Sequence, residues 1–152
     1  AQMPKDPYFH ELKGQIYFEN GKIDLALSSY QMSVDLLPES ALLKAQLAQA
    51  QIEKNLPALL KKAVNNLLFS VDKDPTRSFV WRQLGIAYGR LGKMGESSRA
   101  LAEEAILQGR NSEANRIAER AKKLLKIGTP NWLRAEDIIT AARLKNKTKE
   151  SQ

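Results

Sequence analysis

Only one histidine, His10, and no cysteine occur among the 152 residues of this chain. A cysteine-histidine nucleophilic pair and a zinc site built from several histidines are therefore excluded within it. A serine triad would depend on His10, for which we expect a packing role. The glycines occur singly, so no glycine-rich loop is available to hold phosphate. We expect this chain alone to carry no catalytic site, no metal and no cofactor.

The other polar residues can bind a partner molecule without catalysing a reaction. Arg82 and Arg90 stand eight residues apart, a spacing that places both on one side of a helix. Each guanidinium group can donate a forked pair of hydrogen bonds to a carboxylate. The sequence therefore favours a binding surface over a reactive pocket.

The net charge of +7 is concentrated near the end of the chain. Residues 1–109 hold 13 Lys and Arg against 12 Asp and Glu, whereas residues 110–152 hold 11 against 5. Such a basic balance raises nucleic acid as a partner. No zinc-ligand spacing, RNA-binding aromatic motif or helix-turn-helix pattern accompanies it. A solvated helix face with a basic tail is the favoured interpretation, and we do not expect nucleic acid to be a partner.

The composition favours helices throughout and no membrane-spanning segment. Ala, Leu, Lys, Glu and Gln are abundant, and no apolar run approaches the roughly 18 residues that cross a bilayer. The residues from Ala1 to Pro7 lack the apolar centre of a signal peptide, so any export signal is expected upstream. The absence of cysteine fits an oxidising or a reducing compartment equally.

Trp81, Leu84, Gly85 and Tyr88 form the pattern W-x₂-L-G-x₂-Y, which is typical of the first helix of a tetratricopeptide (TPR) repeat. An earlier unit matches the small, aromatic, turn and terminal-proline places of the same pattern at Gly14, Tyr17, Gly21, Ala26, Tyr30 and Pro38. His10 and Lys13 depart from it, at places that usually hold a large aromatic and a leucine. We expect Phe9 and Leu12 to supply the missing packing.

The second unit ends at Pro75 and is three residues longer than usual, and we place the extra residues in the turn at Asn55-Leu56-Pro57. The next residue that signals a turn after Gly92 is Gly109, which lies only 17 residues further along, half the length of a repeat. The helix at about 95–108 is therefore expected to be the second helix of one unit and the first of the next, with Ala102 and Ala105 for close packing.

The last part of the chain is expected to hold two further helices. Asn111 is predicted to cap a helix with Ala114, Ala118 and Ala121 on one stripe. Thr129-Pro130 is predicted to begin a final helix, at about 131–144, whose Trp132 packs over the preceding helix and which covers the apolar end of the array.

The predicted fold is all-α, a TPR-type right-handed solenoid of antiparallel helix pairs with about eight helices and the last helix as a cap. Residues 1–6 are expected to be disordered or derived from cloning. Residues 7–143 are expected to form a single TPR domain, and residues 144–152 a basic flexible tail.

In TPR domains the first helix of each unit lines the concave surface that holds ligands. This rule predicts a groove that is acidic at first, then rich in amides, then basic; its candidate residues are Glu11, Gln15, Gln46, Gln49, Arg82, Gln83, Arg90 and Arg99. At any one of these places, a solvated polar residue without a ligand is the alternative. TPR clamps for chaperone tails use Lys and Asn where this chain has Glu11, Gln15, Gln46 and Gln49, so such a clamp is disfavoured.

Three strings are similar to one protein family. They are PYFHELKGQ at residues 7–15, WRQLGIAYGR at residues 81–90 and PNWLRAEDI at residues 130–138. Together they resemble the C-terminal TPR region of the BepA-like bacterial periplasmic zinc metallopeptidases. The resemblance covers nearly the whole chain, and His10 and Lys13 fit this family better than the general repeat.

The resemblance implies a periplasmic parent protein with a zinc-binding H-E-x-x-H helix in a separate protease domain. No residue of that motif is present here, so no zinc or catalytic role passes to any position. The implied role is to pack on the protease domain and to engage envelope substrate proteins or their assembly machinery. A freestanding TPR scaffold without a linked enzyme is the alternative.

Overall fold

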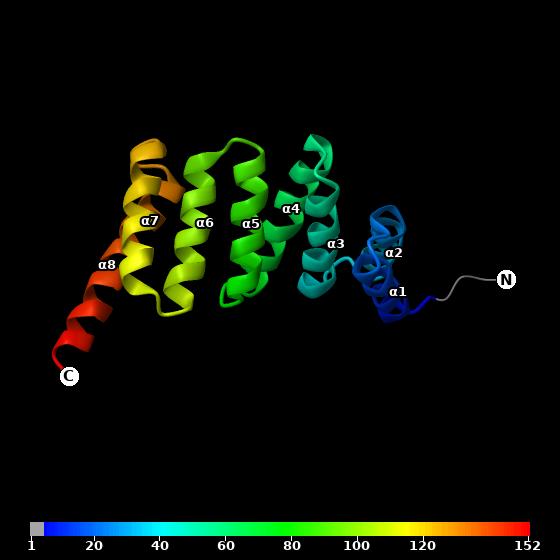
Figure 1. Ribbon diagram of the computed structural model, residues 1–152, viewed down its shortest axis with the longest axis horizontal. Helices are drawn as coiled ribbons and strands as arrows, with labels where there is room; N and C mark the ends of the chain where they lie inside the picture. The colour runs from blue at the N-terminus through cyan, green and yellow to red at the C-terminus, as the bar shows by residue number, and fades with distance from the viewer. Residues whose placement is uncertain (1–4) are drawn as a thin grey trace. The chain divides into compact units, whose positions relative to one another are not determined.

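The computed structural model describes residues 5–152, and these residues form eight α-helices without a strand, as the sequence predicted (Figure 1). The helices are α1 (Pro7–Glu19), α2 (Ile23–Leu36), α3 (Ala41–Lys54), α4 (Pro57–Lys73), α5 (Ser78–Arg90), α6 (Met94–Leu107), α7 (Asn111–Leu124) and α8 (Pro130–Glu150). Residues 1–4 of the predicted disordered segment lie outside the described residues. Asp6 is the N-cap residue of α1, and its Oδ1 accepts a hydrogen bond of 2.9 Å from the backbone N–H of Tyr8.

Two compact units divide the chain, residues 1–74 with α1–α4 and residues 75–152 with α5–α8. We refer to them as unit 1 and unit 2 and describe each by itself. The single domain predicted at residues 7–143 stays a prediction.

Tight turns make α1 antiparallel to α2 and α5 antiparallel to α6, at the glycines that the sequence indicated. Gly21 and Gly92 adopt left-handed backbone angles, with φ of 73° and 76°. The following N–H groups, of Lys22 and Lys93, each donate a 2.9 Å hydrogen bond to the carbonyl of the residue five places earlier. Such bonds satisfy carbonyls that a helix end leaves unpaired, so the chain reverses direction within three residues.

The extra residues of the second repeat lie elsewhere than predicted. Asn55 ends α3 in the left-handed region, with φ of 59°, and Pro57 begins α4, so the turn itself is short. The additional length is in α4, which has 17 residues where α2 has 14. Ala26 and Ala63, like Pro38 and Pro75, are 37 residues apart, so the extra residues form the first turn of α4. The placement in the turn was wrong because Pro57 can occupy the first position of a helix.

Unit 1 has a core that gathers around Tyr30. The buried apolar members are Ala26, Tyr30, Val34, Leu43, Leu47 and Ala50. Gly14 lies directly against the ring of Tyr30, since a Cβ atom built on this glycine would stand 2.7 Å from Tyr30 Cδ1. The absence of a side chain at Gly14 is therefore what lets α1 and α2 approach each other.

His10 itself fills the place of the first large aromatic residue. Its side chain is buried, and its ring meets that of Phe9 edge-on at 5.4 Å between centroids. Phe9 and Leu12 are exposed, at 47% and 58%, so the prediction that they supply the packing was wrong. They lie on the other side of α1 from Gly14, because a helix turns by 100° per residue.

Unit 2 has a core made largely of alanine, on the stripes that the sequence indicated. Its members are Ala102, Ala105, Ile106, Ala114, Ala118, Ala121, Ala135, Ile138, Ile139 and Ala142. Helix α6 contacts α5, α7 and α8. Small side chains on facing helices permit this close packing, and Gly95 of α6 lies in the same way against Leu125.

The turn between α6 and α7 has the same form as the turns within the earlier pairs. Gly109, with φ of 74°, shares the left-handed backbone region of Gly21 and Gly92, and the N–H of Arg110 donates a 2.9 Å hydrogen bond to the carbonyl of Ala105, five places earlier. Helix α6 contacts α7 as well as α5, in agreement with the prediction that it is the second helix of one unit and the first helix of the next. Arg110 is the N-cap residue of α7 and Asn111 its first residue, so Asn111 does not cap it.

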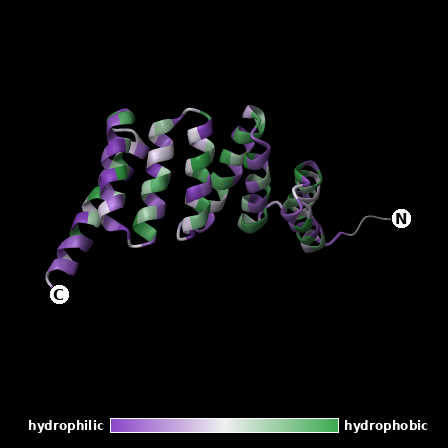
Figure 2. Cartoon of the chain, in the orientation of Figure 1, coloured by the Kyte–Doolittle hydropathy of each residue, from purple (hydrophilic) through white to green (hydrophobic). Residues whose placement is uncertain are grey.

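The final helix begins at Thr129-Pro130 as predicted but ends later. Trp132 lies beside the preceding helix, with Lys122 Nζ 4.8 Å from its ring centroid. Helix α8 continues to Glu150, so most of the predicted tail at residues 144–152 is helical, and Figure 2 shows this end as hydrophilic. The sequence-based boundary was wrong because lysines near a helix C-terminus are favourable there, and Asn146 Nδ2 donates to Ser112 Oγ of α7 at 3.3 Å.

We predict that Gly14→Ala lowers the free energy of unfolding by about 1–2 kcal/mol, because a Cβ atom must displace the buried Tyr30 ring and helix propensity offsets only part of that cost. Urea denaturation followed by circular dichroism measures the change. Gly89→Ala is the matched control, since its Cβ atom would meet only Ser97 Oγ, at 3.4 Å. An equal effect of the two substitutions would contradict the packing role of Gly14.

Candidate functional site

The predicted groove residues of unit 1 are only partly assembled. Gln46 Nε2 on α3 donates a 2.9 Å hydrogen bond to Glu11 Oε1 on α1, so these two meet. Gln46 Oε1 is buried and has no hydrogen-bond partner among the described residues. Gln15 is exposed and donates to Glu19 on its own helix at 3.1 Å, and Gln49 is half-buried on α3. The structure thus joins Glu11 with Gln46 and leaves Gln15 and Gln49 apart from that bond.

The neighbourhood of Glu11 is rich in negative charge and acceptors. Burial first, and then the carboxylates of Glu11 and Glu19, raise the pKa of Tyr30 to about 12. A group that brings a positive charge would find the carboxylates of Glu11 and Glu19 here.

Arg82, Gln83 and Arg90 of unit 2 all lie on α5, where Arg82 and Arg90 are exposed and Gln83 is half-buried. Exposure of these two residues is compatible with a recognition role, which stays a prediction.

Arg99 belongs to a packed cluster instead of the exposed arginine surface. Its guanidinium lies 4.6 Å from the centroid of the Trp81 ring, and one nitrogen is 3.7 Å from Glu103. Its Nε is buried without a hydrogen-bond partner among the described residues. Burial is the main cause that lowers the pKa of Arg99 from its ordinary value.

Glu103 is the centre of this cluster, although it is charged and almost fully buried. Arg134 of α8 donates to it through Nε and through Nη2, the latter at 3.2 Å from Oε2. These hydrogen bonds are the largest cause that raises the pKa of Arg134. A bidentate pair of this kind offsets the cost of burying a carboxylate and fixes α8 against α6. The sequence analysis missed this role of Arg134, although the residue lies in one of the three strings.

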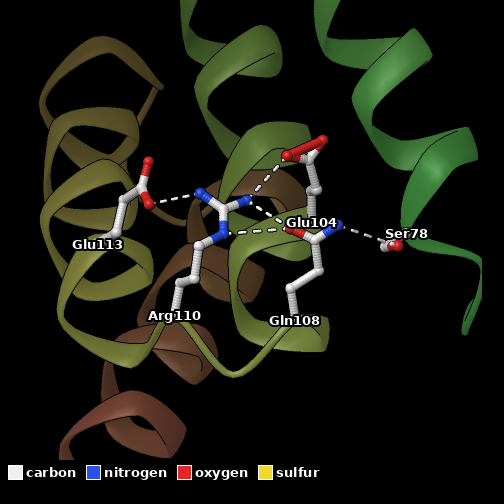
Figure 3. Close-up of polar contacts among 5 residues, drawn as sticks. All are labelled: Ser78, Glu104, Gln108, Arg110 and Glu113. Carbon is white, nitrogen blue, oxygen red and sulfur yellow. Dashed lines mark hydrogen bonds and ion pairs between the residues drawn. The ribbon is translucent and has the colours of Figure 1, made fainter.

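A second polar cluster holds the turn between α6 and α7 (Figure 3). Arg110 Nη2 donates to Glu104 Oε1 at 2.8 Å, and Nη1 donates to Glu113. Gln108 Oε1 accepts from Arg110 at 2.8 Å and 3.1 Å, while its Nε2 lies 3.5 Å from Ser78 Oγ at the start of α5. The Arg110 guanidinium thus joins α6 to α7, and Gln108 extends the cluster to α5, so we assign it a structural role.

A row of exposed apolar side chains marks one side of α1. Tyr8, Phe9, Leu12 and Ile16 are all between 47% and 58% exposed. Spacings of three and four residues place them along one face of the helix. Contiguous exposed apolar side chains of this kind are typical of surfaces that contact another protein.

Unit 1 also carries two hollows that the sequence did not predict. One, of about 500 Å³, is lined by Gln31, Val34, Asp35, Pro38, Lys44, Leu47, Gln51, Lys62, Asn65 and Asn66. The other, of about 440 Å³, is lined by Leu27, Ser28, Gln31, Met32, Leu47, Gln51, Leu59 and Lys62. Both lie between α2 and α4 over α3. Residues from three helices build them, so no single motif could have indicated them.

Within residues 5–152, no group of His, Asp and Glu side chains is arranged to hold a metal ion. None of the helices in this range combines the length and the apolar character that a membrane crossing requires.

Comparison with known proteins identifies the fold. Solved structures align over most of this chain, and three of them are the first TPR of Spaghetti (RPAP3) bound to HSP90 peptide SRMEEVD, MamA, and the Arabidopsis OM64 TPR domain. The RPAP3 domain aligns with a TM-score of 0.65 at 21% identity, over 78% of this chain and 91% of its own. MamA aligns with a TM-score of 0.67 at 17% identity, over 98% and 83%.

The OM64 domain aligns with a TM-score of 0.64 at 17% identity, over 78% of this chain and 96% of its own. This chain has a TPR-type fold. No family model matches its sequence, and no curated protein is significantly similar to it. Because the identities are low, the TPR-type fold is what these structures establish.

We predict that Arg134→Ala lowers the free energy of unfolding by about 2 kcal/mol, because it leaves the buried Glu103 with fewer hydrogen bonds to a charged group. Arg143→Ala on the same helix is the control. Arg143 pairs with Glu119 at the surface, and exposed pairs contribute about 0–1 kcal/mol. Thermal denaturation of both variants measures the difference, and equal losses would remove Glu103 from the centre of the α6–α8 contact.

Proposed function

We propose that this chain is the noncatalytic TPR region of a zinc-dependent metalloendopeptidase that acts in quality control of cell-envelope and outer-membrane proteins. The observation that carries the proposal is the similarity of residues 7–15, 81–90 and 130–138 to the BepA-like periplasmic metallopeptidases. These strings fall within α1, α5 and α8, so they lie in both units.

In this proposal the chain recruits substrate or partner proteins and packs on its own protease domain. The exposed apolar row on α1 supports the packing role, since Tyr8, Phe9, Leu12 and Ile16 form a surface suited to another folded domain. The exposed Arg82 and Arg90 support the recruiting role, because guanidinium groups recognise carboxylates of a protein partner. Zinc would be held by the protease domain, and the location would be the periplasm.

Chaperone tails are not the proposed ligand. The RPAP3 domain that shares this fold is bound to an HSP90 peptide. In this chain Glu11 and Gln46 are bonded to each other where such a clamp would present Lys and Asn. A carboxylate-ended peptide would meet the negative charge of Glu11 there.

The complete reading frame of the gene is the decisive test. An export signal and an H-E-x-x-H motif upstream of residue 1 are the expected result. A complete frame without them would overturn the protease proposal and leave a freestanding TPR scaffold as the function.

We predict that Arg82→Glu weakens binding of the separately expressed protease domain, or of an envelope substrate protein, by about tenfold, because one guanidinium group is replaced by a repelling carboxylate. The free energy of unfolding should stay within about 0.5 kcal/mol, as for other surface changes. Isothermal titration calorimetry measures the binding.

Lys93→Glu is the control for this substitution, because Lys93 is an exposed basic residue in the turn after α5. An unchanged affinity in the Arg82 variant, or an equal loss in both variants, would remove Arg82 from the binding surface.

A further inference from the structure

The two hollows of unit 1 form one continuous trough. They share the lining residues Gln31, Leu47, Gln51 and Lys62. Leu47 and Gln51 of α3 are both 2% exposed and make the floor, while α2 and α4 make the walls. The trough therefore lies on the second helices of two repeats, away from the α1 and α3 residues predicted to line the groove.

The two ends of the trough differ in the side chains that line them. Helices α2 and α4 run in the same direction, because each is antiparallel to α3, which lies between them in sequence and contacts both. On α2 the lining passes from Leu27 to Asp35, and on α4 it passes from Leu59 to Asn66. At about 1.5 Å per residue, both stretches span roughly 10–12 Å. Each hollow has a mixed lining, because Ser28 lies near the leucines of one and Val34 and Pro38 lie near the polar residues of the other.

Side-chain amides line the middle of the trough and the end near Asn66. Asn66 Nδ2 donates to Gln51 Oε1 at 3.1 Å, and Gln31 Nε2 donates to Asp35 Oδ1 at 2.8 Å. Each of these bonds uses one N–H group or one lone pair of its amide. An amide side chain carries two N–H groups and a carbonyl, so donors and acceptors remain for a peptide backbone.

Positive charge predominates over the trough as a whole, since Lys62 lines both hollows while Lys44 and Asp35 line only the first. Among the described residues, no carboxylate lies within ion-pair distance of Lys44 or Lys62. Lys44 Nζ is 3.8 Å from the centroid of the Phe69 ring. The carboxylate of Asp35 accepts from Gln31. Two ammonium groups against one engaged carboxylate favour a negatively charged ligand.

We propose that this trough binds an extended peptide that carries an apolar side chain followed, within about four residues, by carboxylates. The apolar side chain lies between Leu27, Met32 and Leu59, and the carboxylates pair with Lys62 and Lys44. An extended chain advances about 3.3 Å per residue, so four residues span the 10–12 Å of the walls. This peptide site is additional to the surface assigned to Arg82 and Arg90.

Nuclear magnetic resonance titration of the whole ¹⁵N-labelled chain tests the proposal. The probes are acetyl-Leu-Ala-Asp-Glu-amide and the same residues in reverse order, because either chain direction fits the trough. The signals of Gln31, Leu47, Gln51 and Lys62 are expected to shift saturably with one of them. A matched probe with Asn and Gln in place of Asp and Glu should give no saturable shift. Saturable shifts with the neutral probe, or none with either acidic probe, would overturn the proposal.

Lys62→Glu and Lys61→Glu form a matched pair of variants, because both lysines are exposed on α4 and only Lys62 lines the trough. We expect Lys62→Glu to weaken binding by about tenfold or more, since the nearest cation becomes a repelling carboxylate. Lys61→Glu should change the affinity by less than about twofold.

If both variants weakened peptide binding equally, the acidic peptide would be attracted by the overall charge of the chain, and the proposed site would be overturned. Trough signals that shift with protein concentration in the absence of peptide would assign the trough to a second copy of this chain, which also overturns it. The spectra themselves report whether each variant is folded. Because Arg82→Glu leaves the trough intact, failure here and failure of the proposed function are distinguishable.

Discussion

Close approach of neighbouring helices at very small side chains is the constraint on which both units depend. In unit 1 the ring of Tyr30 lies where a side chain on Gly14 would be, and in unit 2 Leu125 lies over Gly95 in the same way. Backbones that approach so closely leave little freedom in helix rotation. The direction in which each remaining side chain points is then determined, including the exposed arginines of α5 and the apolar row of α1.

Features with a local cause were predictable from the sequence. Gly21, Gly92 and Asn55 mark turns because the left-handed backbone region suits them, and the alanine stripe of α7 follows from helical periodicity. Errors arose where a tertiary partner decided the outcome. Phe9 and Leu12 have the character of core residues but lie on an exposed face, and the end of α8 is helical where charge alone indicated a tail. Neither outcome is encoded within a few neighbouring residues.

The candidate sites were harder to predict from the sequence than the fold, because they depend even more on tertiary contacts. Sequence position predicted that Arg82 and Arg90 would be accessible, and they are exposed. The same rule placed Arg99 in the predicted groove with them. In the structure the Arg99 guanidinium lies near both the Trp81 ring and Glu103, because an aromatic face and a buried carboxylate each attract a guanidinium group. The trough of unit 1 could not be predicted at all. Gln31, Lys44 and Lys62 each have the character of a solvated helix residue, and only the arrangement of three helices brings them together.

The alanine core of unit 2 has a thermodynamic consequence. An alanine side chain has no rotamers to lose, whereas burying each leucine or isoleucine costs about 0.5–1 kcal/mol of side-chain entropy. Alanine also removes less apolar area from water, and that area determines the heat capacity change of unfolding. The contacts among α6, α7 and α8 are therefore expected to weaken little on cooling, because less of their stability comes from the temperature-dependent hydration of large apolar groups.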